Sequence, residues 1–133
     1  LGVKRQIESC QRVGVKRVIL VSSLCAGRLQ HPLNLFGLIL IWKRVGEQSL
    51  ENSQLDWTVI RPGGLNEKEE DLEKESIKYT GPNIQEDAYI PRRLVARVCI
   101  ETLKTPSSIG KIIEITSNQE TPSISMGKAI ESF

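Results

Sequence analysis

The sequence is poor in the residues that carry most metal and redox chemistry. Its 133 residues include one histidine, His31, and three cysteines, Cys10, Cys25 and Cys99. The cysteines are odd in number, far apart and without metal-ligand spacing, so they predict reduced thiols in a cytosol-like compartment rather than a disulfide framework. His31 has no acidic or cysteine neighbour in the sequence, and we interpret it as a solvated loop residue.

Long apolar runs and an excess of one charge are also missing. The longest apolar run, residues 35–42, is about half of the roughly 20 residues that span a bilayer. The 18 basic and 16 acidic residues are interleaved and give a net charge of +2, which is not the basic footprint of a nucleic-acid-binding protein. The sequence therefore predicts no transmembrane segment and no DNA or RNA partner.

The composition is that of ordinary globular material, with 39% hydrophobic and 26% charged residues. We therefore expect one domain over residues 1–133. The only methionine is Met126, and the chain starts in a helical pattern at Leu1. We interpret the sequence as a piece of a longer protein.

Two stretches have the character of buried strands. Residues 15–22 form a nearly continuous apolar run, and residues 56–60 are β-branched and aromatic. The second run ends at Arg61-Pro62-Gly63-Gly64, because proline cannot donate to a strand ladder and glycine loosens the backbone. A helical pattern over residues 35–52 separates the two runs. This strand-helix-strand unit predicts parallel pairing with a right-handed crossover.

The remaining patterns extend the same architecture. They predict an amphipathic helix over 2–13, a charged solvated excursion over 67–75, an edge strand over 77–80, a helix over 91–104, a strand over 111–116 and a last helix starting at Thr121-Pro122. Strands that alternate with helices indicate an α/β fold with a largely parallel sheet. Ligands of such sheets bind beyond the carboxyl ends of the strands, which is where Ser22, Ser23 and Pro62–Gly64 fall.

The helix over 35–52 changes character halfway. Residues 35–42 are apolar all round, whereas from Lys43 onward we expect a buried stripe of only Val45 and Leu50, with Glu47 among the polar residues outside it. The apolar half needs cover from the rest of the chain, a second subunit or a membrane surface. We favour a subunit interface, and hence a homo-oligomer.

Four motifs together resemble a known family. They are GVKRVILVSS (14–23), WKRVGEQSLENSQLDWTVIRPGGL (42–65), IPRRLVARVCIETL (90–103) and KIIEIT (111–116). The chain resembles the carboxyl-terminal half of an atypical short-chain dehydrogenase/reductase, of the NAD(P)-binding, NmrA-like kind found in cyanobacteria and chloroplasts. The resemblance implies a Rossmann-like parallel sheet with flanking helices that lacks its amino-terminal strands, in the cytoplasm or the chloroplast stroma.

The resemblance also implies a nicotinamide-side site. Ser23, with Ser22 beside it, matches the serine that hydrogen-bonds substrate, and Lys43 matches the lysine that binds the nicotinamide ribose and supports proton transfer. Pro62–Gly64 match the loop that passes the nicotinamide. The family's tyrosine lies four residues before the lysine, and that position here is Ile39, which cannot shuttle protons. For Arg61 we expect a structural role that anchors the loop.

The family's phosphate-binding loop has no counterpart in this sequence. No G-x-G-x-x-G occurs in it, so we expect NAD(P) to bind only together with the missing amino-terminal half. Three functions stay open: an NAD(P)-dependent oxidoreductase or epimerase-like enzyme, a cofactor-binding but non-catalytic regulator or assembly factor, and a truncated domain that binds no cofactor.

Overall fold

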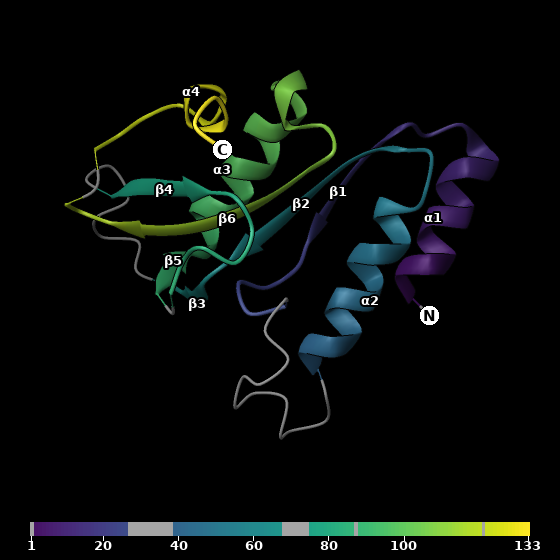
Figure 1. Ribbon diagram of the computed structural model, residues 1–133, viewed down its shortest axis with the longest axis horizontal. Coiled ribbons are helices and arrows are strands. Elements are labelled where there is room, and N and C mark those ends of the chain that lie inside the picture. Colours follow the sequence, from purple (N-terminus) through teal and green to yellow (C-terminus); the bar gives the residue numbers. More distant parts are fainter. Residues whose placement is uncertain (1, 27–38, 68–74, 87, 121) are drawn as a thin grey trace.

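A computed structural model describes residues 2–26, 39–67, 75–86, 88–120 and 122–133 of the chain (Figure 1). The helices are α1 (Gly2–Val13), α2 (Ile39–Glu51), α3 (Arg92–Leu103) and α4 (Met126–Ile130), with a 3-10 turn, η2 (Pro106–Ser108). The strands are β1 (Arg17–Val21), β2 (Asp56–Pro62), β3 (Gly64–Asn66), β4 (Ser76–Thr80), β5 (Tyr89–Pro91) and β6 (Lys111–Asn118).

The main sheet is largely parallel, as the sequence predicts. It has four strands in the order β1-β2-β6-β4. Strands β1 and β6 both run parallel to β2, with Leu20 opposite Val59 and Ile113 opposite Ile60. Strand β4 pairs antiparallel with β6 at the edge. The α/β fold class and the edge strand predicted at 77–80 are therefore confirmed.

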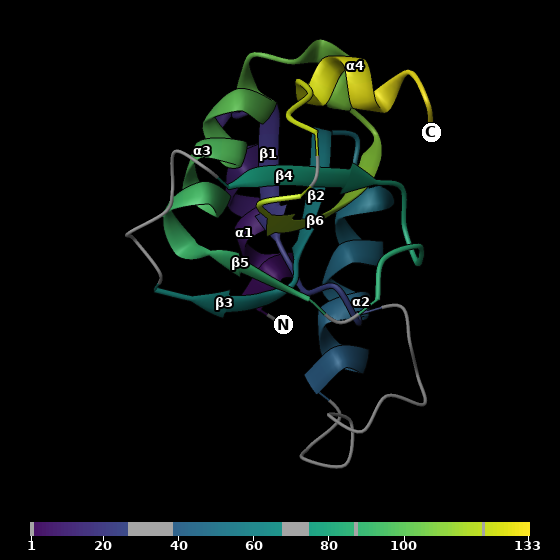
Figure 2. The same ribbon diagram turned by 90° about the vertical axis from the view of Figure 1, so that its left-hand side faces the viewer.

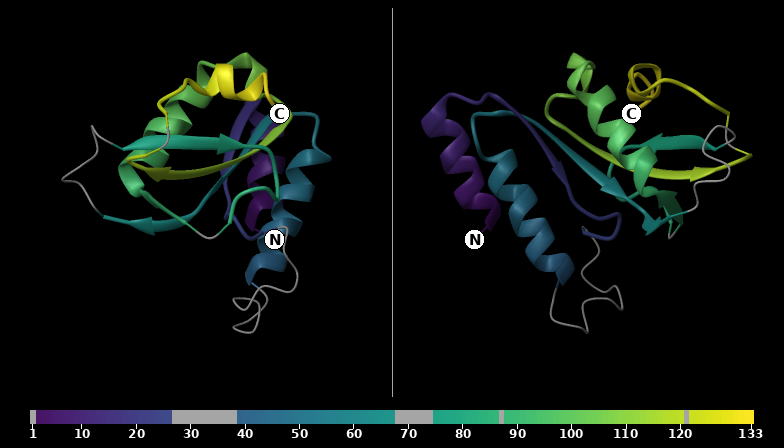
Figure 3. Two further views of the ribbon diagram at one scale, coloured as in Figure 1. Left: turned by 60° about the vertical axis from the view of Figure 1, so that its left-hand side comes forward. Right: turned by 180° about the vertical axis from the view of Figure 1, so that it is seen from behind.

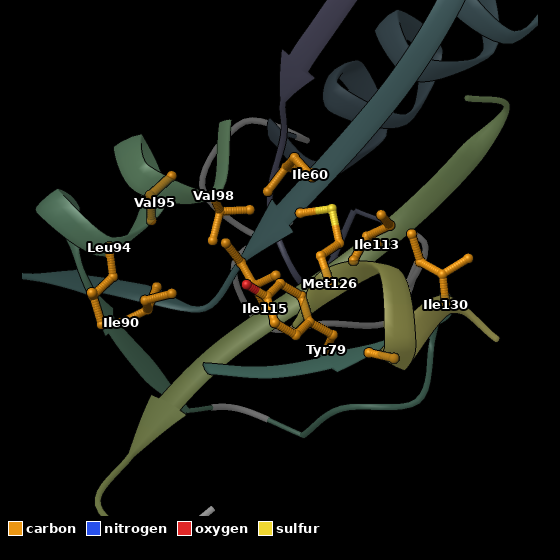
Figure 4. Packing of buried hydrophobic residues seen from close by; sticks show 11 residues of the cluster. Ile60, Tyr79, Ile90, Leu94, Val95, Val98, Ile113, Ile115, Met126 and Ile130 are labelled. Atoms are coloured by element: carbon orange, nitrogen blue, oxygen red, sulfur yellow. The ribbon is translucent and has the colours of Figure 1, made fainter. Parts of the chain in front are cut away.

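Helices cover both faces of this sheet (Figures 1 and 3). On one face, Ile7 of α1 and Leu50 of α2 pack with Val59 of β2. On the other face, the next residue of β2, Ile60, joins a larger cluster with residues of α3 and α4 (Figure 4). Successive side chains of a strand point to opposite faces, so β2 serves both clusters. Fully burying each such side chain contributes roughly 1.5–3 kcal/mol.

Most element boundaries differ from the sequence-based expectation by a few residues, and three of these differences have a local cause. Strand β2 continues to Pro62 instead of ending at Ile60, because Arg61 and Pro62 still pair with Glu114 and Ile115 of β6. Helix α3 starts at Arg92, after Pro91 as its N-cap residue. Helix α4 starts at Met126 rather than at 121–122, because the Ser125 side chain accepts from the Lys128 N–H and caps the helix.

Other expectations meet the structure only in part. The predicted residues 35–38 of the second helix, His31 and most of the charged run 67–75 lie outside the described residues. Cys10, Cys25 and Cys99 all lie in the described part of the chain, and none of them forms a disulfide bond there. No helix in the described part of the chain has the length and apolar character needed to cross a membrane.

A second, two-stranded sheet follows directly on β2 and was not predicted. Strands β3 and β5 pair in parallel, with Gly64 opposite Tyr89 (Figure 2). Each strand is three residues long, which is too short to show an alternation of apolar and polar residues in the sequence. This pairing explains the two glycines, since a β carbon at Gly63 would stand 2.3 Å from the Ala88 carbonyl oxygen and one at Gly64 would stand 2.6 Å from a ring carbon of Tyr89.

We predict that Gly63→Ala lowers the free energy of unfolding by about 1–3 kcal/mol, because backbone atoms of residue 88 must move away. Gly127→Ala is the matched control. Its β carbon would meet only Thr105 Cγ2, at 3.9 Å, and alanine favours a helix by about 1 kcal/mol over glycine. Urea unfolding followed by circular dichroism measures both, and equal stability of the two variants would contradict the close approach of β5.

Candidate functional site

The carboxyl ends of β1 and β2 lie side by side. The Ser22 N–H donates to the Ile60 carbonyl at 2.7 Å, and the Leu24 N–H donates to the Pro62 carbonyl at 2.9 Å. The chain after β1 thus follows β2 up to its last residue. The structure therefore brings Ser22 and Ser23 next to Pro62 and the start of the glycine pair. Ser22 is buried and Ser23 is half-buried.

The backbone N–H groups of the glycine pair are already used within the protein. The Gly63 N–H donates to the Ile115 carbonyl at 2.9 Å, and the Gly64 N–H donates to the Ala88 carbonyl at 2.8 Å. They are therefore not open donors for a ligand. A ligand at this edge would meet the surface of the loop and the side chains around it.

Lys43 lies on α2, close to the amino end of that helix. Together with Ile39, Trp42 and Val3 it lines a hollow of about 420 Å³ between the first turns of α1 and α2. These turns lie on the same side of the molecule as the carboxyl end of β1 (Figure 1). Ile39 is four residues before Lys43, so the two side chains lie next to each other on one face of the helix.

A buried ion pair joins α2 to the end of β2. Glu47 and Arg61 are 0% and 1% exposed. The Arg61 Nε donates to Glu47 Oε1 at 2.9 Å, and its Nη2 donates to Oε2 at 2.8 Å. Two parallel hydrogen bonds of this kind fix orientation as well as charge. Since Glu47 is one turn after Lys43, the pair sets how Lys43 is placed relative to the strand ends.

The same arginine also reaches the loop after β4. Its Nη1 donates to Asn83 Oδ1 at 3.1 Å and lies 3.6 Å from Glu114 Oε1. Glu114 is fully buried in β6 and accepts from the backbone N–H groups of Asn83, Ile84 and Gln85 at 2.6, 3.0 and 2.8 Å. The anchoring role expected for Arg61 thus takes the form of contacts with α2, β6 and this loop.

The charges around Glu47 decide its protonation. Burial by itself raises the pKa of the Glu47 carboxyl, but hydrogen bonds from Arg61 and Arg44, together with the Arg61 charge, outweigh it. The pKa of Glu47 therefore lies below its ordinary value of 4.5. The buried Ser22 Oγ has no hydrogen-bond partner among the described residues.

The sequence-based interpretation of α2 was wrong at two positions. Glu47 was expected on the polar side and is fully buried, and Val45 was expected in the buried stripe and is 41% exposed. The reason is the partner of Glu47, which lies on another element and is invisible to helical periodicity. A signal was present nonetheless, because an arginine at the end of a buried strand needs an acidic partner.

We predict that Glu47→Gln lowers the free energy of unfolding at pH 7 by about 3–5 kcal/mol, because it removes the closer of the two carboxylates that match the buried Arg61 charge and leaves only Glu114 at 3.6 Å. The depressed pKa of Glu47 implies that its contribution is fully present above about pH 4.5 and is lost as the pH falls through the folded value. The difference in the free energy of unfolding between wild type and variant, measured by urea unfolding, should therefore become smaller below pH 4.5.

Glu67→Gln is the control for this experiment. Glu67 pairs with Arg92 at 3.0 Å on the surface, with its side chain 81% exposed. Its loss should change stability by no more than about 0.5 kcal/mol. A Glu47→Gln effect as small as that of the control would mean that the buried pair does not hold α2 on the sheet.

Comparison with known proteins identifies the family. Residues 2–106 match the sequence profile of a family described as NAD(P)H-binding. An uncharacterised chloroplast protein of Arabidopsis thaliana is 34% identical over 90% of this chain and 38% of its own length. Sanguinarine reductase of Eschscholzia californica is 32% identical over the whole of this chain and 48% of its own length. The chain thus spans less than half the length of these relatives.

The fold comparison agrees with the sequence comparison. A solved structure from Bacillus halodurans, assigned by name to the NAD-dependent epimerases/dehydratases, superimposes with a TM-score of 0.81 at 28% identity, over 99% of this chain and 58% of the other. The sequence profile, the relatives and the fold agree on the same family. The chain belongs to the NAD(P)H-binding, NmrA-like family of atypical short-chain dehydrogenases/reductases.

Proposed function

We propose that this chain forms the nicotinamide side of an NAD(P)-dependent reductase. The observation that carries the proposal is the buried Glu47–Arg61 pair, which fixes the helix of Lys43 to the strand that ends at Pro62–Gly64. The cofactor would supply a hydride. The residues around the strand ends suit the nicotinamide-ribose end of such a cofactor.

Each site residue has a role in this proposal. The Lys43 ammonium holds ribose hydroxyls, which a single cation with three donors can reach together. The half-buried Ser23 hydroxyl orients the substrate, and Ser22 supports it from beside Glu47. The surface of Pro62–Gly64 packs against the nicotinamide ring, while its glycine N–H groups stay engaged within the protein.

The isoleucine at position 39 limits the chemistry. A phenol there would transfer a proton, and isoleucine has none to give. In the proposed reductase the proton comes from water or from the substrate itself. The same residue favours a second candidate, a protein that binds the cofactor and regulates or assembles others without catalysis. The name of the relative sanguinarine reductase supports the first candidate, the NAD(P)-dependent reductase. We propose that this chain works in the cytoplasm or the chloroplast stroma.

We propose that the rest of the cofactor site comes from further sequence that pairs with β1. This strand lies at one edge of the main sheet. Its residues after Arg17 are all apolar, yet Val21 is 45% exposed. Parallel strands are normally covered on both faces and flanked by others. A neighbouring segment that carries a glycine-rich loop would complete the sheet and bind the diphosphate. Without that segment we expect the chain to bind the cofactor weakly, and a chain that binds no cofactor at all would be the third candidate function.

We predict that this chain alone binds NADPH and NADH weakly, with no saturation at millimolar cofactor, and that a longer chain carrying an upstream phosphate loop binds one of them in the micromolar range. Lys43→Ala in the longer chain should weaken binding about tenfold, or about 1.4 kcal/mol. Lys16→Ala, an exposed lysine before β1, is the control. Calorimetric titration measures cofactor binding by the 133-residue chain, the longer chain and its two variants. Tight binding by the 133-residue chain alone would refute the proposal that the cofactor site needs a further segment.

We also propose that residues 35–42 contribute to contacts between subunits. Of this run the structure describes residues 39–42, where Ile39 and Trp42 are 51% and 65% exposed while Leu40 is buried. Two large exposed apolar side chains on one helical turn favour association. The exposed positions are therefore the ones to change.

We predict that Trp42→Lys shifts the protein to a smaller species in analytical ultracentrifugation while leaving the unfolding midpoint nearly unchanged. Leu40→Lys is the contrasting variant, because a charge at a buried position should unfold the chain instead. An unchanged sedimentation coefficient for Trp42→Lys, at concentrations where the wild type associates, would exclude this helix from the interface.

A further inference from the structure

A second hollow, which we call the amino-end hollow, opens at the opposite end of the strands from the candidate site. It has a volume of about 440 Å³, and the described residues that line it include Glu51, Trp57, Pro82, Ile84, Ile112 and Phe133. Trp57 lies near the start of β2 and Ile112 near the start of β6. None of the residues of this lining adjoins a residue outside the described ranges.

Large apolar side chains gather around the amino-end hollow. Trp57 and Ile112 are half-buried and pack against the cluster that α1 and α2 form on the sheet. Ile84 and Phe133 are 63% and 44% exposed. Clefts of roughly 300–1,000 Å³ with apolar walls are the usual sites of small molecules in proteins. Because two of these walls are aromatic, the hollow suits a flat ligand.

The loop after β4 forms one wall of the hollow and is held in place. Strand β4 pairs with β6 only from Glu114 onward, and the chain leaves the sheet at Gly81-Pro82, where the proline has no N–H to donate to a ladder. The buried Glu114 carboxylate then accepts from the Ile84 N–H at 3.0 Å and from the N–H groups on either side of it. This wall is therefore formed before any ligand binds.

The polar groups of the lining without a partner are donors. The Glu51 carboxylate pairs with Arg44. Lys111 is exposed and forms no ion pair with a described residue, and the Trp57 indole N–H donates to none of the described residues. A cation and an N–H donor beside apolar walls favour a ligand with an anionic head group.

We propose that the amino-end hollow binds an aromatic acid, a flat apolar ring system that carries one carboxylate. The rings pack among Trp57, Ile84 and Phe133, and the carboxylate accepts hydrogen bonds from Lys111 and from the indole N–H. Neither Lys43 nor Pro62–Gly64 lines this hollow. The proposal is therefore independent of the proposed reductase, and the ligand is neither its cofactor nor its substrate.

The test is a calorimetric titration of the 133-residue chain, near neutral pH, with two probes of one shape, the anion 2-naphthoate and the neutral 2-naphthamide. The anion should bind saturably and at least about tenfold more tightly, because only the anion gains charge-assisted hydrogen bonds. Lys111→Gln should remove most of this difference. Ile84→Ser should weaken the binding of both probes about fivefold, because it removes part of the apolar wall.

Two variants elsewhere on the surface are the matched controls. Lys43→Gln changes the lysine of the hollow between α1 and α2, and Ile100→Ser changes an isoleucine of α3 that is 57% exposed. Each should change the affinity for 2-naphthoate less than about twofold.

Three results would overturn the proposal: no saturable binding of 2-naphthoate, equal affinity for the two probes, or a loss of affinity in Lys43→Gln as large as in Lys111→Gln. Unchanged binding of both probes by Ile84→Ser would also overturn it. Lys111 and Ile84 are both exposed, so neither change should unfold the chain, and circular dichroism of each variant checks this.

Discussion

An arginine in the middle of a folded domain must have its charge matched, and Arg61 meets this condition through contacts with α2, with β6 and with the loop after β4. It forms two hydrogen bonds with Glu47 of α2 and one with Asn83, and it lies near Glu114 of β6. Each partner is needed because an unmatched charge in a site with 1% exposure would cost several kcal/mol. This side chain and the packing of Leu50 on Val59 together hold α2 on the sheet.

Polar groups fix the opposite end of β2 as well. The Thr58 hydroxyl donates to the Ser108 carbonyl at 2.7 Å, and Arg17 donates to the Ser108 hydroxyl at 2.9 Å. Between these two ends the side chains of β2 are apolar and alternate between the two faces. The strand is therefore held by polar contacts at its ends and by hydrophobic burial in its middle, which leaves its carboxyl end as a rigid border for the site.

Close packing around the glycine pair shapes the candidate site. The glycine pair is required by Ala88 and by Tyr89 at the start of β5, because these residues occupy the space of any larger side chain. The loop can therefore present its surface to a nicotinamide ring while its N–H groups remain bonded within the protein. Ile39, in turn, lies in the hollow beside Lys43, so no phenol stands next to the lysine there.

The sequence by itself determined the alternation of strands and helices, the parallel sheet and the position of Ser22, Ser23 and Pro62–Gly64 at strand ends, because these follow from local periodicity and from residues that stop a strand. It could not place Glu47 inside the protein, since helical periodicity counts charge as exposure and the partner lies on another element. It also could not reveal β3 and β5, whose three residues each are too few for a pattern. Only the tertiary structure brought Tyr89 onto Gly64 and Glu75 beside Ser117, because contacts between residues far apart in the chain depend on how the elements pack.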